Sequence, residues 1–206
     1  MQKETARLEA FSDGVFAIAI TLLVLELRVP EGDLLRGLLR EWPSFLSFTL
    51  SFVTILIMWT NHHANLSHVE RIDGRLLFAN GFLLLMVTFV PFPTAVLGTH
   101  LKGGDAHVAA TFYAATFVAI NVAWVYFWRS IVRARKRLAP GLPDHEVRTV
   151  NQALVVGLVS YLTATALSWF SAPAGVGLCM LLAGFWTFQA MRHHGDDHHH
   201  DAGDST

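Results

Sequence analysis

The chain has 206 residues, of which 53% are hydrophobic and 15% are charged, and its formal net charge is −1. Soluble domains average about 25% charged residues, so the surface of this protein must be largely apolar, and lipid is the solvent that tolerates such a surface. The near-neutral charge gives no reason to expect a nucleic-acid partner. The single cysteine, Cys179, excludes an intrachain disulfide framework and a multi-cysteine zinc site.

Apolar residues are gathered into long runs, and a membrane-spanning helix needs about 20 of them. Runs such as 82–87 do not alternate between apolar and polar residues, which argues against a β-barrel. The sequence therefore predicts an all-α integral membrane protein with six transmembrane helices per subunit. The expected spans are residues 11–27, 43–61, 76–98, 108–128, 150–170 and 174–191.

Residues 1–191 are predicted to form a single transmembrane domain, and three features refine this prediction. Pro91 and Pro93 fall inside the third span, and each removes a backbone donor, so we expect that helix to bend or end there. The three residues 171–173 between the last two spans predict an antiparallel hairpin. The His- and Asp-rich tail, residues 192–206, is expected to be disordered, and we assign it no metal site.

Lysine and arginine are distributed unequally between the two sides of the predicted bundle. With six spans, both termini and the second and fourth connections share one side. That side carries eleven basic residues and the other carries four, namely Arg28, Arg36, Arg40 and Lys102. Cytoplasmic loops are enriched in such residues, so we expect a multi-pass plasma-membrane protein with both termini in the cytoplasm. The basic run 129–137 fits either this topology signal or a site for anionic lipid.

The first span differs from a plain anchor because Ser12 and Asp13 lie near its cytoplasmic end, with Arg7 one to two turns earlier. A carboxylate at membrane depth is costly and indicates a functional site. Glu4 and Glu9 suggest that the helix begins before the membrane, which lowers that cost. The residues alone leave a structural network and a functional site equally open.

The segment Arg7-Leu8-Glu9-Ala10-Phe11-Ser12-Asp13 resembles the RxxxFSD signature of the transmembrane protein 175 family, the endolysosomal potassium channels and their prokaryotic homologues. Two later stretches are similar to the same family, the WTNHH run at residues 59–63 and Asn80 with the PFPT run at residues 91–94. The resemblance covers about residues 7–98. The chain carries one copy of the signature, as prokaryotic members do.

This resemblance implies a homotetramer of six-helix subunits in which the first helix of each subunit lines a central pore. It also implies a pore without a re-entrant loop, and the sequence has no TVGYG-like filter segment. The implied function is a potassium-preferring cation channel. Its partners are then monovalent cations, membrane lipid and further copies of the chain, and the protein is neither an enzyme nor the holder of a cofactor.

On a helical wheel Ile18, Leu22 and Leu25 form one stripe, with Thr21 about 60° from Ile18 and Ser12 and Asp13 on the opposite side. The resemblance implies that Ile18, Leu22 and Leu25 form a hydrophobic gate, and that Ile18 and Thr21 set cation preference. An ordinary packing stripe in a monomeric bundle is the alternative. The polar side predicts a network that holds the pore helix, comprising Arg7, Phe11, Ser12, Asp13, Trp59, Asn61, His62, His63 and Asn80.

A cation- or proton-coupled transporter is the competing interpretation, with Asp13 and the histidine pair as its coupling site. Transporter sites usually lie near the midplane between repeats, whereas these groups gather at one interface. A membrane enzyme is disfavoured because the chain has no HExxH or GxSxG motif.

Overall fold

The computed structural model describes residues 2–200, with side chains described for residues 4–189 apart from residue 137. Within this part of the chain every regular element is helical. In order they are α1 (Gln2–Leu22), the short 3₁₀ helix η1 (Leu23–Glu26), α2 (Leu34–Arg40), α3 (Trp42–Ser67), α4 (Gly74–Thr88), α5 (Pro91–His100), α6 (Ala106–Arg133), α7 (Arg135–Leu138), α8 (Asp144–Phe170) and α9 (Ala172–His200).

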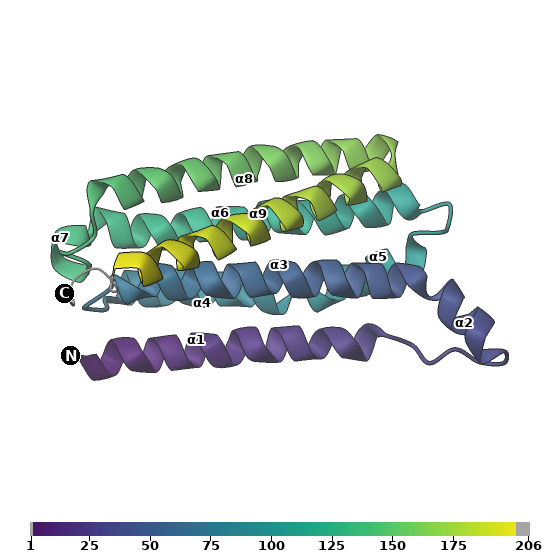
Figure 1. Ribbon diagram of the computed structural model, residues 1–206, viewed down its shortest axis with the longest axis horizontal. Helices are drawn as coiled ribbons and strands as arrows, with labels where there is room; N and C mark the ends of the chain where they lie inside the picture. The colour runs from purple at the N-terminus through teal and green to yellow at the C-terminus, as the bar shows by residue number, and fades with distance from the viewer. Residues whose placement is uncertain (1, 201–206) are drawn as a thin grey trace.

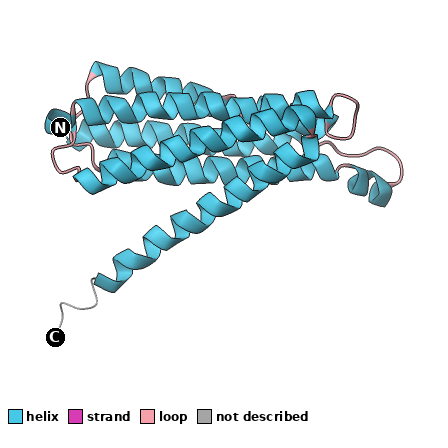
Figure 2. Ribbon diagram, turned by 90° about the horizontal axis from the view of Figure 1, so that it is seen from above, coloured by secondary structure: helices cyan, strands magenta, loops and turns pink. Residues whose placement is uncertain are grey.

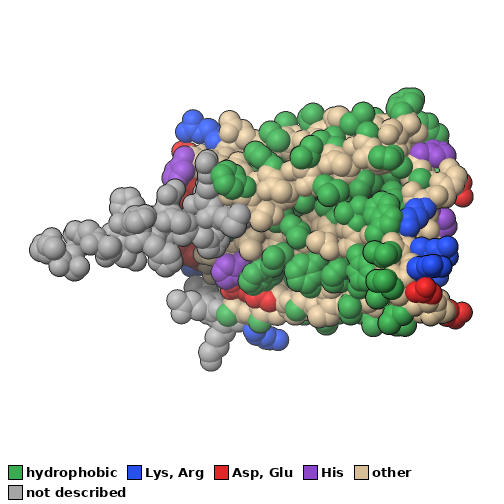
Figure 3. All heavy atoms as spheres, turned by 45° about the vertical axis from the view of Figure 1, so that its right-hand side comes forward, with side chains coloured by type: hydrophobic (Ala, Val, Ile, Leu, Met, Phe, Trp, Pro, Cys, Tyr) green, Lys and Arg blue, Asp and Glu red, His purple; other side chains and the backbone are tan. Residues whose placement is uncertain are grey.

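Six helical segments are long and apolar enough to cross a membrane, which confirms the predicted number of spans. They are Glu4–Glu26, Trp42–Ser67, Gly74–His100, Ala106–Arg133, Asp144–Phe170 and Ala172–Gln189. Figure 3 shows apolar side chains over the middle of the visible face and charged side chains at its two ends. This distribution matches a bilayer core between two polar interfaces, and the protein is a multi-pass membrane protein.

Both chain ends lie at the same end of the bundle, as Figure 1 shows. Helix α6 forms the centre, because it packs against α4, α5, α8 and α9. Helix α1 lies at the edge and packs chiefly against α3 and α4. One long face of α1 therefore has no partner among the described residues of the subunit.

The third span is broken, as the two prolines predict. Helix α4 ends at Thr88 and α5 begins at Pro91. The Thr94 hydroxyl donates to the Val90 carbonyl at 2.8 Å, and it lies 2.7 Å from the Ser51 hydroxyl of α3. Pro91 and Pro93 remove the usual donors to the carbonyls of Val87 and Phe89. These carbonyls accept instead from Val90 N–H at 3.1 Å and Phe92 N–H at 3.2 Å, so they keep the partners that backbone groups inside a bilayer require.

Helix α9 forms the predicted hairpin with α8 and then leaves the bundle, as Figure 2 shows. It has no break at residue 191, the boundary predicted for the transmembrane domain, and continues to His200. The disorder expected of the tail stays a prediction, and residues 201–206 lie outside the described residues.

Candidate functional site

Helix α1, together with the first residue of η1, buries a single stripe, chiefly against α3 and α4. Leu8, Ser12, Phe16, Ala19 and Leu23 are all buried and recur at helical spacing. Four of these residues are apolar, so packing accounts for them. Ser12 is fully buried and polar, so it needs hydrogen-bond partners.

Those partners form a buried chain from α1 through α4 to α3. The Ser12 hydroxyl donates to the Leu8 carbonyl at 2.8 Å, so its oxygen is left to accept, and Asn80 Nδ2 donates to it at 3.0 Å. This fixes the orientation of the Asn80 carboxamide. Its oxygen lies 2.7 Å from His62 Nε2, so that ring nitrogen must carry a proton and donate.

The His62 ring is held by aromatic neighbours as well as by Asn80. It is fully buried, stacks on Phe127 with ring centroids 5.2 Å apart, and lies 5.3 Å from the ring of Phe16. His62 Nδ1 is buried without a partner among the described residues. Nε2 carries the proton, and Nδ1 has no acceptor for a second proton in this apolar setting. The imidazole is therefore neutral.

A second pair of contacts joins α1 to α3 nearer the surface. Trp59 Nε1 donates to Asp13 Oδ1 at 2.9 Å, and His63 Nδ1 lies 2.8 Å from Glu9 Oε1. Asp13 is four residues beyond Glu9 and His63 is four beyond Trp59. The two antiparallel helices therefore meet at two successive turns.

Three residues predicted for the network lie outside it. Phe11 is 63% exposed, and Arg7 and Asn61 are also exposed. Within the described part of the chain, neither Arg7 nor Asn61 makes a hydrogen bond or ion pair, so Arg7 does not neutralise Asp13 here. The prediction is corrected on these three positions because each points away from the α1–α3 contact. Glu9, which was not assigned to the network, belongs to it.

The predicted pore stripe lies on the uncovered face of α1. Ile18 is 58% exposed, Leu22 is 40% and Leu25 is 73%, and Thr21 is exposed too. The Thr21 hydroxyl donates to the Ile18 carbonyl at 2.9 Å. Its oxygen keeps its lone pairs, and these are available to accept from outside the helix.

The helix changes type within this stripe. The α-helical turns of α1 end at Leu22, and Leu25 lies in η1. A 3₁₀ helix has about three residues per turn, so side chains at i and i+3 eclipse. Leu25 therefore lies almost directly beyond Leu22. Phe11, seven residues before Ile18, extends the same stripe toward the N-terminus.

Comparisons with known proteins identify the family to which this arrangement belongs. Residues 7–91 match the family described as Endosomal/lysosomal potassium channel TMEM175. A protein of Chamaesiphon minutus named a potassium channel is 46% identical, over 92% of this chain and 96% of that protein. A protein of Streptomyces collinus, also named a potassium channel, is 39% identical over 91% of this chain and 94% of that protein.

A solved structure agrees with these sequence matches. The crystal structure of a lysosomal potassium-selective channel TMEM175 homolog from Chamaesiphon minutus matches with a TM-score of 0.83 and 45% sequence identity, over 91% of this chain and 98% of that chain. Sequence and fold thus agree over nearly the whole length, and the chain belongs to the TMEM175 family.

Proposed function

We propose that this protein is a potassium-preferring cation channel, built as a homotetramer in which four copies of α1 line a central pore. One observation carries the proposal. The polar side chains Ser12 and Asp13 turn inward to α3 and α4. The opposite face of α1 and η1, which carries Ile18, Thr21 and Leu25, has no partner among the described residues of the subunit. The relatives named potassium channels support the same function, and the family is described as a channel family rather than an enzyme family.

The composition of the uncovered face of α1 suits a helix that approaches its own copies. Gly14, Ala17 and Thr21 are small and exposed, and small residues allow helix backbones to come close in a membrane. Ile18 and Leu22 lie beside them on the same exposed face. Rings of four bulky apolar side chains at an axis exclude water and block ions by dewetting, so Ile18, Leu22 and Leu25 act as the gate without a re-entrant loop.

The buried contacts then have a positioning role. Asn80 and Trp59 hold α1 from two directions about 100° apart around its axis, through the adjacent residues Ser12 and Asp13. Four helices around an axis form a narrow constriction only if each keeps its rotation. We therefore assign Ser12, Asp13, Trp59, His62, His63 and Asn80 to fixing the pore helix, with both chain ends in the cytoplasm of a plasma-membrane protein.

The proposal is tested by reconstituting the purified protein into liposomes with opposed potassium and sodium gradients. We expect potassium to flow passively down its gradient, faster than sodium and faster than through protein-free liposomes. Flux that saturates at the turnover rate of a carrier, or that requires a proton gradient, would show a coupled transporter and overturn the proposal. Flux no greater than in the protein-free control would overturn it as well.

Thr21 is the polar residue of the uncovered stripe and is expected to contribute to ion preference. Replacing it with valine keeps the shape but removes a hydroxyl that substitutes for part of an ion's hydration shell. The proposed tetramer loses four such hydroxyls. If together they favour potassium over sodium by about 0.5–1.5 kcal/mol, the scale of one hydrogen bond, their loss should lower the potassium-to-sodium permeability ratio by roughly 2- to 10-fold. Reversal potentials in a planar bilayer measure this ratio.

Two variants serve as controls for the Thr21→Val experiment. Thr21→Ser retains the hydroxyl and should retain most of the preference. Thr163 of α8 is also exposed and donates to the carbonyl four residues earlier at 2.8 Å, so Thr163→Val makes the same chemical change away from α1 and should have no effect. An unchanged ratio in Thr21→Val would remove this residue from ion selection.

A further inference from the structure

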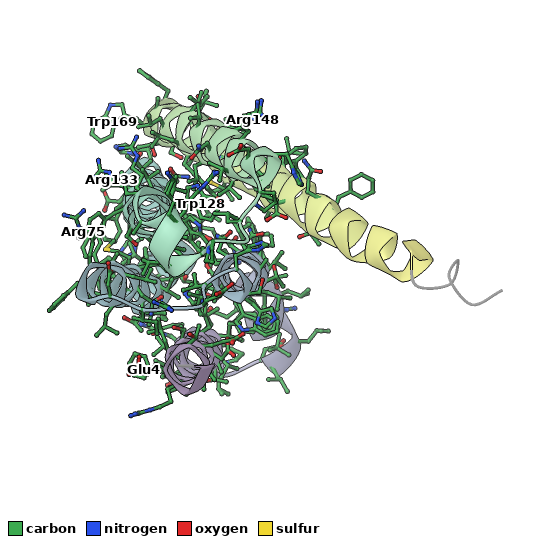
Figure 4. All side chains as sticks on the ribbon, turned by 90° about the vertical axis from the view of Figure 1, so that its left-hand side faces the viewer. Glu4, Arg75, Trp128, Arg133, Arg148 and Trp169 are labelled. Carbon is green, nitrogen blue, oxygen red and sulfur yellow. The ribbon has the colours of Figure 1, made fainter. Side chains whose placement is uncertain are left out.

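A group of arginines gathers on one flank of the bundle, at the end that holds the chain termini. Arg75 lies in the first turn of α4, and Arg129 and Arg133 lie in the last two turns of α6. All three are exposed, and α4 and α6 pack against each other. Figure 4 shows Arg75 and Arg133 pointing outward from the same flank. Two segments far apart in the sequence thus build one cationic patch.

The charge of this patch is not neutralised within the described residues. The ion pairs at this end of the bundle join Glu9 to His63, Glu146 to His68 and Asp144 to Arg135. None of them involves Arg75, Arg129 or Arg133, and none of these three side chains forms a hydrogen bond to a described residue. The patch therefore offers three guanidinium groups to an external anion.

Toward the membrane centre from the arginines, the same flank carries exposed aromatic side chains. Phe82 lies seven residues beyond Arg75 and is 43% exposed, and Tyr126 lies seven residues before Arg133 and is 46% exposed. Seven residues are almost two full turns, so each aromatic residue lies on the same helix face as its arginine, on the side toward the membrane centre. Farther from the arginines, the ring centroid of Phe112 in α6 lies 6.4 Å from that of Phe89, so aromatic side chains continue along this flank.

We propose that Arg75, Arg129 and Arg133 bind the headgroup of an anionic phospholipid, in the leaflet on the side of the chain termini, with its acyl chain along Phe82 and Tyr126. Arginine binds phosphate oxygens through paired N–H donors. The three guanidinium groups lie at the end of the membrane span, where headgroups lie, and the aromatic side chains lie at the depth of acyl chains. A topology signal explains how many basic residues this side holds, but it does not explain their gathering on one flank above exposed aromatic residues.

The proposal is tested by measuring which lipid the protein retains. Wild-type protein is reconstituted into vesicles of equal parts phosphatidylglycerol and phosphatidylcholine, extracted in mild detergent, and analysed by native mass spectrometry. We expect phosphatidylglycerol to be retained in preference. In the triple variant Arg75→Gln, Arg129→Gln, Arg133→Gln this preference should fall about 10-fold or more, since each basic residue contributes to the attraction of an anionic lipid.

Two further variants separate specific binding from general charge and from misfolding. The triple variant Arg28→Gln, Arg36→Gln, Arg40→Gln removes the same number of arginines at the opposite end of the bundle and should keep the wild-type preference. Replacing the three proposed residues with lysine keeps their charge and should keep part of the preference. Equal loss in both glutamine variants, or no loss in either, would overturn the proposal. So would a glutamine variant of the patch that changes oligomer mass but not lipid content, because the flank would then contact a second copy of the chain.

Discussion

Replacing Ile18 with asparagine is expected to raise potassium flux through the reconstituted protein on the order of 100-fold. Four copies of the residue meet at one constriction in the proposed tetramer, so the substitution acts four times. If each polar side chain eases hydration of the pore by about 0.8 kcal/mol, the scale of one methylene group, the barrier to an ion falls by about 3 kcal/mol. The measurement is the initial rate of potassium efflux from liposomes at equal protein content.

Val159 of α8 provides the matched control for Ile18→Asn. It is 58% exposed in the subunit, as Ile18 is, and it is also β-branched and lies within a membrane span. Asparagine at residue 159 makes the same chemical change on α8, which packs mainly against α6 and α9 and lies on the opposite side of the bundle from α1 (Figure 1). Flux should then stay at the wild-type level. If both variants leak equally, the leak reflects a disturbed bilayer rather than an opened gate, and if neither leaks, Ile18 is not the constriction.

The six spans were predictable from sequence because the bilayer imposes one length and one polarity on every helix that crosses it. The break at Pro91 was predictable because proline removes a backbone donor. The short elements α2, α7 and η1 were not predicted. Each has seven residues or fewer, too few for a hydrophobic period to emerge, so local hydrogen bonds and neighbouring chain decide their form.

The candidate site was predictable where spacing alone decides which face a residue occupies. Ser12 lies opposite the Ile18 stripe on any helical wheel, and the structure buries it beside Asn80. The errors came from treating members of one motif as members of one network. Phe11 lies within about 20° of Ile18 on a wheel, so its exposed position was readable from the sequence.

The partner of His63 required a different signal. Glu9 and Asp13 repeat the four-residue spacing of Trp59 and His63, and two antiparallel helices bring such pairs together turn by turn. That pattern was visible, but the depth at which the two helices meet depends on packing between segments about fifty residues apart. No local rule supplies that register.

Asn80→Leu is expected to destabilise the folded protein by about 2 kcal/mol, because two buried hydrogen bonds are lost and His62 Nε2–H is left without its acceptor. The leucine is similar in size, so the effect comes from the lost polar partners rather than from a cavity. For a chain of this length the corresponding fall in melting temperature is about 4–8 °C. The measurement is the fraction of detergent-solubilised protein that still elutes as folded, unaggregated protein after heating to a series of temperatures.

Asn61→Leu makes the same substitution at a position that the signature motif also contains, but where the side chain is exposed. Its effect should stay within about 0.5 kcal/mol.

A double-mutant cycle of Asn80→Leu with Ser12→Ala tests whether the contacts act as one unit. Once Asn80 is replaced, Ser12 has already lost its donor, so adding Ser12→Ala should cost less than it does in the wild-type background. Additive losses would show that Ser12 and Asn80 stabilise α1 independently, and equal losses from Asn61→Leu and Asn80→Leu would show that burial of this chain of contacts does not determine stability. A strongly coupled pair would instead link the rotation of the proposed pore helix directly to α4 and, through His62, to α3.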